Sequence, residues 1–264
     1  MKNNKTYLNK FIKNGYVLIE NAMSVKECEQ IKIIYNKILN KYAKKIKINN
    51  PLEDAIYNLH NKDSIFLKYI DHKKVIGIIK KALSLGSYNK NDFIILRQSA
   101  IRNPKKGFAQ QLHNDTRISG VDKPLIIQAI WMIDNFTSKN GGTRILPLSH
   151  KLDLFPENQK KYKGELTIKG KKGTVLLLNA SIWHGSSKKT NNDDRLGMIF
   201  SYSRWFLKPT FDHTKNTPQK IYHKLNSFQK ELLGFKFNPP LDEFFSKSVR
   251  SNKNIKPNKN YKLP

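Results

Sequence analysis

The sequence predicts a mainly β protein with helices flanking a central β core. Between residues 93 and 205, segments rich in branched apolar residues alternate with clusters of Gly, Pro, Asn and Asp. Short apolar segments with such turn signals are typical of a sandwich or barrel rather than of βαβ units. We expect the main strands within residues 93–102, 125–134, 173–179 and 195–205.

The chain before this core is predicted to be largely helical. Residues 6–14 and 73–84 are expected to form helices, and residues 16–20 a short strand. Ser24 and Glu27 have the spacing of a capping box. Behind them, apolar residues recur every three or four positions, which predicts a long helix with one buried face. The residues of that face are Cys28, Ile31, Tyr35, Ile38 and Tyr42.

The strand signals stop after Pro209. Thr217 and Pro218 have the pattern of an N-cap followed by a first helical proline, and Gly234 that of a C-terminal cap, so we predict one helix between them. We expect one domain over residues 1–264. Its parts are an N-terminal helical region (1–92), the β core (93–205), a C-terminal helical segment (206–246) and a flexible tail (247–264).

Composition narrows the class of protein. Of 264 residues, 38% are hydrophobic, which is ample for a packed core without disulfides or a structural metal. Lys and Arg total 49 against 20 acidic residues, a net charge of +29. The lysines are dispersed from end to end, which favours solubilising charge over the clustered basic surface that nucleic acids require. We therefore expect no nucleic-acid partner.

Cysteine content and hydropathy point to the cytoplasm. A single cysteine, Cys28, excludes an intrachain disulfide or a cysteine-rich zinc site, and its place on an apolar helix face predicts a buried, inert thiol. No apolar run approaches the 18 residues of a membrane span, and the first 20 residues lack the apolar stretch of a signal peptide. A cytoplasmic protein without membrane contact is expected, monomeric by default.

One histidine has a carboxylate at a metal-binding spacing. Of the seven histidines, only His113 is followed two residues later by an acid, Asp115. In a strand, such residues point to the same face, so both could reach one ion, as in Fe(II) sites with two histidines and one carboxylate. Taken alone, the pair is also consistent with an ordinary strand pair.

A second histidine and an arginine extend this site. His184 follows the strand at 173–179 and precedes a Gly-Ser-Ser turn, and Arg195 begins the next strand. We predict that His184 and Arg195 lie on antiparallel neighbours and converge on one pocket. The guanidinium could then hold a carboxylate in bidentate fashion. Separately, His184 could be a core histidine and Arg195 a surface charge.

Several motifs together resemble one enzyme family. QLHND, IWMIDNFTSKNGGTRILPLSH and TVLLLNASIWHGSS, followed by Arg195, resemble the phytanoyl-CoA dioxygenase family of Fe(II)/2-oxoglutarate oxygenases. The similarity spans about residues 11–245 and includes FQKELLGFKFNPPL, which is similar to bacterial members. The resemblance implies a double-stranded β-helix core (jelly-roll, cupin-like) and iron held by His113, Asp115 and His184. It also implies that Arg195 pairs with the outer carboxylate of 2-oxoglutarate, with O2 as the other cosubstrate.

The resemblance suggests three more cosubstrate residues. Ser186 matches a hydroxyl that helps the arginine, Trp131 a position that contacts 2-oxoglutarate, and Gln111 a polar position near it. Each has a structural alternative: a turn cap for Ser186, a core side chain for Trp131 and an outward strand residue for Gln111.

Other positions near these motifs have structural interpretations. Leu148 stands where the family usually has glycine, so we expect the local backbone to differ. His150 is expected to be a packed structural residue. Arg117 and Arg144 could meet an anionic substrate at the mouth of the pocket, although solvated charge is the simpler interpretation.

The predicted activity is oxidation of a small organic molecule, and the positive charge of the chain weakly favours an anionic one. In the family that the sequence resembles, halogenating members lack the metal carboxylate. The presence of Asp115 therefore favours hydroxylation or a related oxidation, and the resemblance implies release of succinate and CO2. Two alternatives stay open: a basic nucleic-acid-binding module, and a non-catalytic metal-binding protein on the same barrel.

Overall fold

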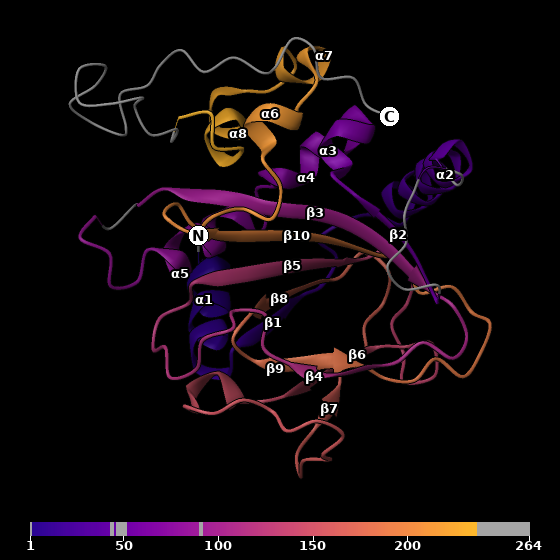
Figure 1. Ribbon diagram of the computed structural model, residues 1–264, viewed down its shortest axis with the longest axis vertical. Helices are drawn as coiled ribbons and strands as arrows, with labels where there is room; N and C mark the ends of the chain where they lie inside the picture. The colour runs from indigo at the N-terminus through magenta and orange to yellow at the C-terminus, as the bar shows by residue number, and fades with distance from the viewer. Residues whose placement is uncertain (1, 43–44, 46–51, 90–91, 237–264) are drawn as a thin grey trace.

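A computed structural model shows the strands in two antiparallel sheets that face each other (Figure 1). It describes residues 2–42, 45, 52–89 and 92–236. The large sheet has the order β1 (Tyr16–Ile19), β8 (Val175–Asn179), β5 (Ile126–Met132), β10 (Gly197–Arg204), β3 (Ile94–Pro104) and β2 (Glu53–Tyr57). The small sheet has the order β4 (Gln110–His113), β9 (Trp183–Ser186), β6 (Thr143–Leu146) and β7 (Leu166–Thr167). The fold is the predicted double-stranded β-helix with flanking helices.

Helices cover the face of the large sheet that points away from the small one (Figure 1). The N-terminal helices are α1 (Lys2–Asn14), α2 (Val25–Tyr42), α3 (Leu59–Lys62), α4 (Leu67–Ile70) and α5 (Ile76–Leu83). Those after the core are α6 (His213–Asn216), α7 (Gln219–Tyr222) and α8 (Ser227–Leu232). Short 3-10 turns lie at Ser64–Phe66 and Ser149–Lys151. In the described part of the chain, no helix combines the length and apolarity needed to cross a bilayer.

Strand β5 shows how the large sheet divides the interior. All seven of its residues are buried, and successive side chains point to opposite faces. Ile127, Ala129 and Trp131 belong to the core between the large sheet and the helices. Ile130 and Met132 belong to a second apolar cluster between the two sheets. The strand is therefore apolar almost throughout because both of its faces are covered.

The capping box and the buried helix face predicted for residues 24–42 are confirmed in α2. The Ser24 amide donates to Glu27 Oε2 at 2.8 Å and the Glu27 amide to Ser24 Oγ at 3.2 Å, which forms the capping box. The buried residues of α2 are Cys28, Ile31, Tyr35, Ile38 and Tyr42. Burial of the Cys28 side chain raises the pKa of its thiol to about 11, which keeps the thiol protonated at neutral pH.

The prediction of one helix after Thr217 is wrong. Two short helices, α7 and α8, occupy this segment, and Pro218 rather than Thr217 is the N-cap of α7. The break occurs because the Asn226 side chain accepts a hydrogen bond from the Gln229 amide at 2.8 Å and starts a new helix. Gly234 does follow the end of α8, with φ of +84°. The predicted tail at 247–264 lies outside the described residues.

Candidate metal centre and cosubstrate pocket

The structure brings His113, Asp115 and His184 together between the two sheets. One ligand atom from each lies within 4.8 Å of the others. Asp115 Oδ1 is 3.3 Å from His113 Nε2, and Asp115 Oδ2 is 3.4 Å from His184 Nε2. Two ligands at right angles, each about 2.1 Å from an ion, are about 3 Å apart, so these spacings fit one metal with open positions.

Both histidines are oriented in the same way. His113 Nδ1 is 3.0 Å from the Gln111 carbonyl oxygen, and His184 Nδ1 is 2.9 Å from the Ile182 carbonyl oxygen. A carbonyl can only accept, so each Nδ1 carries the proton and donates it. With Nδ1 protonated, loss of the Nε2 proton leaves a lone pair that can bind a metal, the arrangement typical of metal-binding histidines.

Asp115 reaches the site by a different route from the one predicted. His113 is the last residue of β4, and Asp115 lies in the turn beyond it rather than two places along a strand. The Asp115 amide donates to the Ala180 carbonyl at 3.0 Å, which fixes the turn. The Gln128 side chain donates to Asp115 Oδ2 and orients the carboxylate.

The charges of this cluster are mutually dependent. Burial raises the pKa of Asp115, but hydrogen bonds from His113 and His184 outweigh it and hold the pKa well below its usual value. Burial lowers the pKa of His113, but the hydrogen bond and the charge of Asp115 together outweigh burial, so the net shift of this pKa is upward. A metal cation would take the place of these shared protons and satisfy the same carboxylate.

Arg195 lies across the interior from His184. The prediction that they occupy neighbouring strands is wrong, because His184 is in β9 of the small sheet and Arg195 precedes β10 of the large one. The predicted turn after His184 is also wrong, since Gly185 and Ser186 continue β9. A Cβ added at Gly185 would lie only 2.5 Å from the Gln110 carbonyl oxygen, so glycine permits the close approach of β4.

The guanidinium of Arg195 is buried without an acidic partner. Only 8% of the residue is exposed, and no carboxylate of the described residues lies within ion-pair distance. Its Nη2 donates to Thr143 Oγ1 at 3.0 Å, and its Cζ lies 4.0 Å from the centre of the Phe136 ring. Burial lowers its pKa to about 10, so it stays charged at neutral pH.

Two buried polar atoms in this part of the cavity have no hydrogen-bond partner among the described residues. One is Nε of Arg195 itself and the other is Ser186 Oγ, and both residues line the same cavity as the metal cluster. A buried polar atom without a partner is costly, and a buried cation more so. A carboxylate in the cavity would satisfy the charge and both atoms, so this pocket fits the outer end of a dicarboxylic acid such as 2-oxoglutarate.

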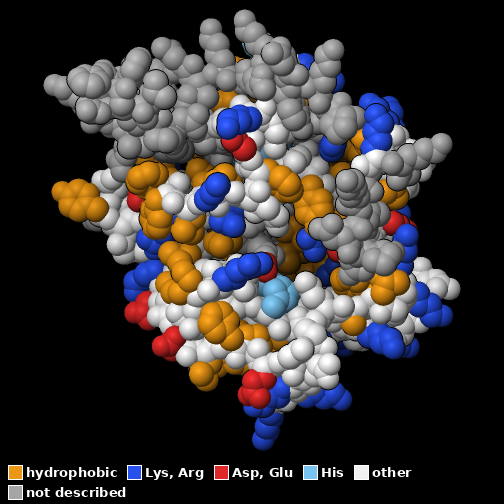
Figure 2. Space-filling view, in the orientation of Figure 1, with side chains coloured by type: hydrophobic (Ala, Val, Ile, Leu, Met, Phe, Trp, Pro, Cys, Tyr) orange, Lys and Arg blue, Asp and Glu red, His pale blue; other side chains and the backbone are white. Residues whose placement is uncertain are grey.

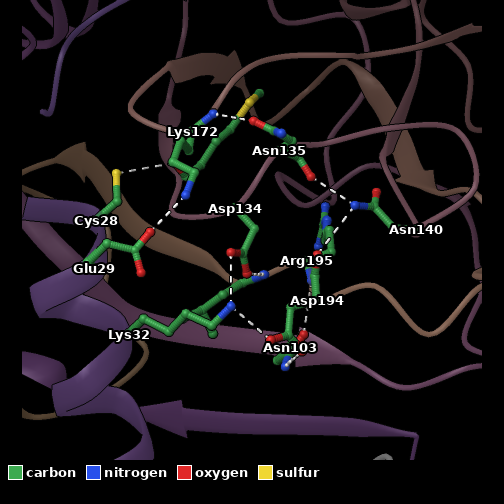
Figure 3. Close-up of polar contacts among 12 residues, drawn as sticks. Cys28, Glu29, Lys32, Asn103, Asp134, Asn135, Asn140, Lys172, Asp194 and Arg195 are labelled. Atoms are coloured by element: carbon green, nitrogen blue, oxygen red, sulfur yellow. Dashed lines mark hydrogen bonds and ion pairs between the residues drawn. The ribbon is translucent and has the colours of Figure 1, made fainter. Parts of the chain in front are cut away.

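A polar network fixes the backbone on both sides of Arg195 (Figure 3). The Arg195 amide donates to Asn103 Oδ1 at 3.1 Å, and the next amide, of Leu196, donates to Asp134 Oδ2 at 3.0 Å. Lys32 of α2 joins this network, with its Nζ 3.1 Å from Asp134 Oδ1 and 2.8 Å from Asp194 Oδ2. Hydrogen bonds therefore hold the backbone in place on both sides of Arg195.

Ser186 lines the cavity, whereas Gln111 and Trp131 do not. A β-bulge explains Gln111: Gln110 pairs with Ser186 but His113 pairs with His184, so β4 has one extra residue and Gln111 turns outward. The inward glutamine is Gln110, and Gln111 contributes only its carbonyl. Trp131 is fully buried on the helix-covered face, 5.2 Å from Tyr69 and 4.9 Å from His72 between ring centroids.

The cavity has a volume of ≈ 170 Å³ and includes polar residues beyond the predicted site residues. Gln98, Gln110, Gln128, Thr143 and Arg102 are among them. Gln128 carried a usable signal, because it is the single polar residue in the buried strand β5. Arg102 forms an ion pair with Glu53, with 3.6 Å between Arg102 Nη1 and Glu53 Oε1, and its Nη2 donates to the Tyr57 hydroxyl at 3.0 Å.

The remaining candidates do not line the cavity that contains the metal cluster. His150 is buried against Gly15, as a structural histidine would be. Arg144 pairs with Glu165 at 3.3 Å, whereas Arg117 lines a neighbouring cavity. Leu148 has φ of +66°, the left-handed backbone that glycine adopts most easily.

The protein thus combines a jelly-roll fold with a cluster of two histidines and one carboxylate that could hold a metal ion. The family model described as "Phytanoyl-CoA dioxygenase (PhyH)" matches residues 11–197. The chain belongs to the phytanoyl-CoA dioxygenase family. A relative that matches over most of its length is "Uncharacterized protein Rv1501" of Mycobacterium tuberculosis, 22% identical over 242 residues, which are 88% of this chain and 87% of the relative.

Two solved structures share the fold. HygX from Streptomyces hygroscopicus, crystallised with nickel and 2-oxoglutarate, has a TM-score of 0.64 and 16% identity over 78% of this chain and 88% of its own. The non-haem α-ketoglutarate-dependent epimerase SnoN, from nogalamycin biosynthesis, has a TM-score of 0.62 and 12% identity over 79% of this chain and 86% of its own.

Proposed function

We propose that the protein is an Fe(II)- and 2-oxoglutarate-dependent dioxygenase that hydroxylates a small organic substrate in the cytoplasm. The observation that carries this proposal is the pairing of two features in one cavity. One is the His113–Asp115–His184 cluster, and the other is a buried arginine, Arg195, with an unsatisfied Nε. The family assignment and the ligands of HygX support it.

Each residue has a defined role in this proposal. His113 and His184 offer Nε2 atoms to Fe(II), and Asp115, oriented by Gln128, supplies the carboxylate. Arg195 pairs with the far carboxylate of 2-oxoglutarate, and Ser186 donates its hydroxyl to the same group. Bound there, iron and 2-oxoglutarate would supply the oxidising chemistry with O2 and yield succinate and CO2. The protein contributes orientation and a largely polar cavity, whose wall also includes the apolar residues Ile130 and Ile199.

The first test is Fe(II) binding under anaerobic conditions, followed by succinate formation from 2-oxoglutarate and O2 without added substrate. We expect one equivalent of iron and slow succinate formation in the wild type, and loss of both in His113→Ala. His223→Ala, which removes an exposed histidine outside the cavity, is the matched control and should behave as the wild type.

Two results would favour the alternatives. A loaded iron site without O2 consumption or succinate would indicate a non-catalytic metal-binding protein. Absence of iron binding, together with tight binding of DNA or RNA that weakens steeply with salt, would indicate a nucleic-acid-binding module. Hydroxylation itself is tested by the mass of the substrate, which gains one oxygen atom on hydroxylation and none on epimerisation.

A further inference from the structure

A second, larger cavity adjoins the metal cluster. Its volume is ≈ 530 Å³, and it shares three residues with the smaller cavity: Gln98, Asp115 and Gln128. Arg195 lines only the smaller one. A molecule in the larger cavity would therefore lie beside the metal carboxylate without competing for the guanidinium that we assign to 2-oxoglutarate.

The larger cavity has two cations and little negative charge. Arg97 and Arg117 line it, and Asp115 is its single acidic residue. Asp115 is already engaged by His113, His184 and Gln128. Within residues 2–42, 45, 52–89 and 92–236, neither arginine has a carboxylate within ion-pair distance, in contrast to Arg102 in the smaller cavity.

A β-bulge turns Arg97 toward this cavity. Ser201 of β10 pairs with Gln98 of β3, but the next residue, Tyr202, pairs with Leu96, so Arg97 is an extra residue in β3. A bulge re-aims a side chain, and Arg97 and Gln98, although consecutive, both line the cavity. Arg97 Nη1 donates to the Lys208 carbonyl at 2.8 Å, which holds the guanidinium in place. Burial lowers the pKa of Arg97, as expected for a half-buried cation, while the charge of Asp115 opposes the shift.

Arg117 projects from an ordered turn that follows the metal ligand. The Asn114 side chain accepts hydrogen bonds from the Thr116 amide at 2.8 Å and the Arg117 amide at 3.2 Å. Its Nδ2 also donates to the Ile118 carbonyl at 3.2 Å. The position of Arg117 is thus tied to that of Asp115, two residues earlier.

Apolar side chains complete the cavity wall. Ile118, Leu125 and Leu207 line it together with the two arginines. On the face of the molecule in Figure 2, hydrophobic and basic side chains, together with a histidine and an acidic side chain, lie around a hollow near the centre. This mixture of cations and apolar surface fits a ligand with an anionic group and an apolar body.

We propose that the larger cavity binds the substrate, and that the substrate is a small organic anion. Its carboxylate or phosphate pairs with Arg97 and Arg117, and its apolar part lies against Ile118, Leu125 and Leu207. Pairing at the arginines directs the rest of the molecule toward Asp115 and the metal. This inference rests on the proposed function, because it takes the metal cluster as the place of reaction.

The test uses full-length protein loaded with Ni(II) and saturated with 2-oxoglutarate, which fills the smaller cavity without turnover. Benzoate, phenyl phosphate and neutral benzamide are titrated by calorimetry. A charge-assisted hydrogen bond is worth about 1.5–3 kcal/mol, so we expect one of the anions to bind at least about tenfold more tightly than benzamide. Arg97→Gln and Arg117→Gln should each lower the affinity for that anion by about tenfold and leave the affinity for benzamide unchanged. Comparison of the two anions distinguishes a carboxylate site from a phosphate site.

Lys123→Gln is the matched control, since it removes a neighbouring positive charge that does not line the cavity. It should leave anion affinity unchanged. Arg97→Gln also removes the contact to the Lys208 carbonyl, so its fold is checked by thermal melting. Arg117→Gln alters only an exposed side chain and keeps the test decisive if Arg97→Gln fails to fold.

Two outcomes would overturn the inference while the proposed function stands. The first is anion affinity no higher than that of benzamide, and the second is anion affinity that is unchanged in the folded arginine variants. If the wild type binds neither Ni(II) nor 2-oxoglutarate, the proposed function itself fails and this inference fails with it.

Discussion

The two faces of strand β5 have different roles, although both are buried: one belongs to the main core and the other lines the candidate site. On the helix-covered face, Ile127, Ala129 and Trp131 form part of the main core, where shape and apolar area determine the contribution to stability. On the face toward the small sheet, Gln128 donates a hydrogen bond to the Asp115 carboxylate and Ile130 lines the same cavity. Burial alone therefore does not distinguish a core position from a site position; the side of the sheet does.

The largest effect expected from this comparison is on stability. Trp131→Ala removes a fully buried indole that packs against Tyr69 and His72, and such truncations cost about 3–5 kcal/mol. Urea denaturation should show this loss. The KM for 2-oxoglutarate of the folded fraction should stay unchanged, because Trp131 does not line the cavity.

Trp131→Phe provides a milder variant if the alanine variant does not fold. A rise in KM for 2-oxoglutarate in that variant, without a matching loss of stability, would restore the sequence-based prediction that Trp131 contacts the cosubstrate. It would also contradict the assignment of the two faces.

On the site side, Arg195→Gln should act on binding rather than stability. It removes the buried cation that we propose to pair with the far carboxylate of 2-oxoglutarate. Loss of a charged interaction of about 2–3 kcal/mol should weaken 2-oxoglutarate binding by about 30- to 150-fold. Stability should not fall to the same degree, since the guanidinium is buried without an acidic partner among the described residues and with an unsatisfied Nε. Fluorescence or calorimetric titration with 2-oxoglutarate measures the change.

Arg144→Gln is the control for Arg195→Gln. Arg144 pairs with Glu165 and does not line the cavity, so 2-oxoglutarate should bind as in the wild type. Equal losses in the two variants would mean that net charge, not the placement of Arg195, attracts the cosubstrate.

A smaller effect is expected from Gln128→Leu, which keeps the side-chain volume but removes the donor to Asp115. Loss of a hydrogen bond to a metal ligand typically costs about 10–100-fold in metal affinity, and we expect about tenfold for Fe(II) or Ni(II) here. Metal titration with a competing chelator measures it. Ile127→Val changes the adjacent residue on the opposite face and should leave metal affinity unaltered; a similar drop there would show that β5 acts as one unit.

The sequence indicates the composition of the site better than its geometry. Apolar periodicity is sufficient to predict α2, and apolar runs are sufficient to predict β3, β5, β8 and β10, because both patterns reflect burial. The members of the His113–Asp115–His184 cluster can be predicted from the sequence, because histidine and aspartate side chains are characteristic metal ligands. Gln111 shows the limit: a single bulged residue in β4 reverses which face its neighbours share, and bulges leave no reliable trace in one sequence.

Sequence patterns also do not predict which residues meet across the two sheets. His184 and Arg195 are 11 positions apart, and their spacing predicts neighbouring strands, yet the chain crosses from the small to the large sheet between them. The same limit applies to Arg97, whose role depends on a bulge and on the carbonyl of Lys208, 111 residues later. Long-range pairing depends on the whole fold and not on local propensity.

The smallest effect concerns pH and the helix-covered side of β3. His213 is almost fully buried, and burial lowers its pKa to about 4, although the hydrogen bond from its Nε2 to the Arg97 carbonyl at 3.2 Å opposes the shift. In the unfolded chain its pKa returns to about 6.5, so acidification first protonates the unfolded state and favours unfolding. This contribution to stability is complete at neutral pH and falls as the pH drops from about 6.5 toward 4, by on the order of 1 kcal/mol at about pH 5.5. Urea denaturation at about pH 7.5, 6.5 and 5.5 should show a steeper loss of unfolding free energy with falling pH in the wild type than in His213→Phe. A variant of the exposed His223 should follow the wild type. Equal dependence of stability on pH in all three proteins would show that His213 is not buried in solution.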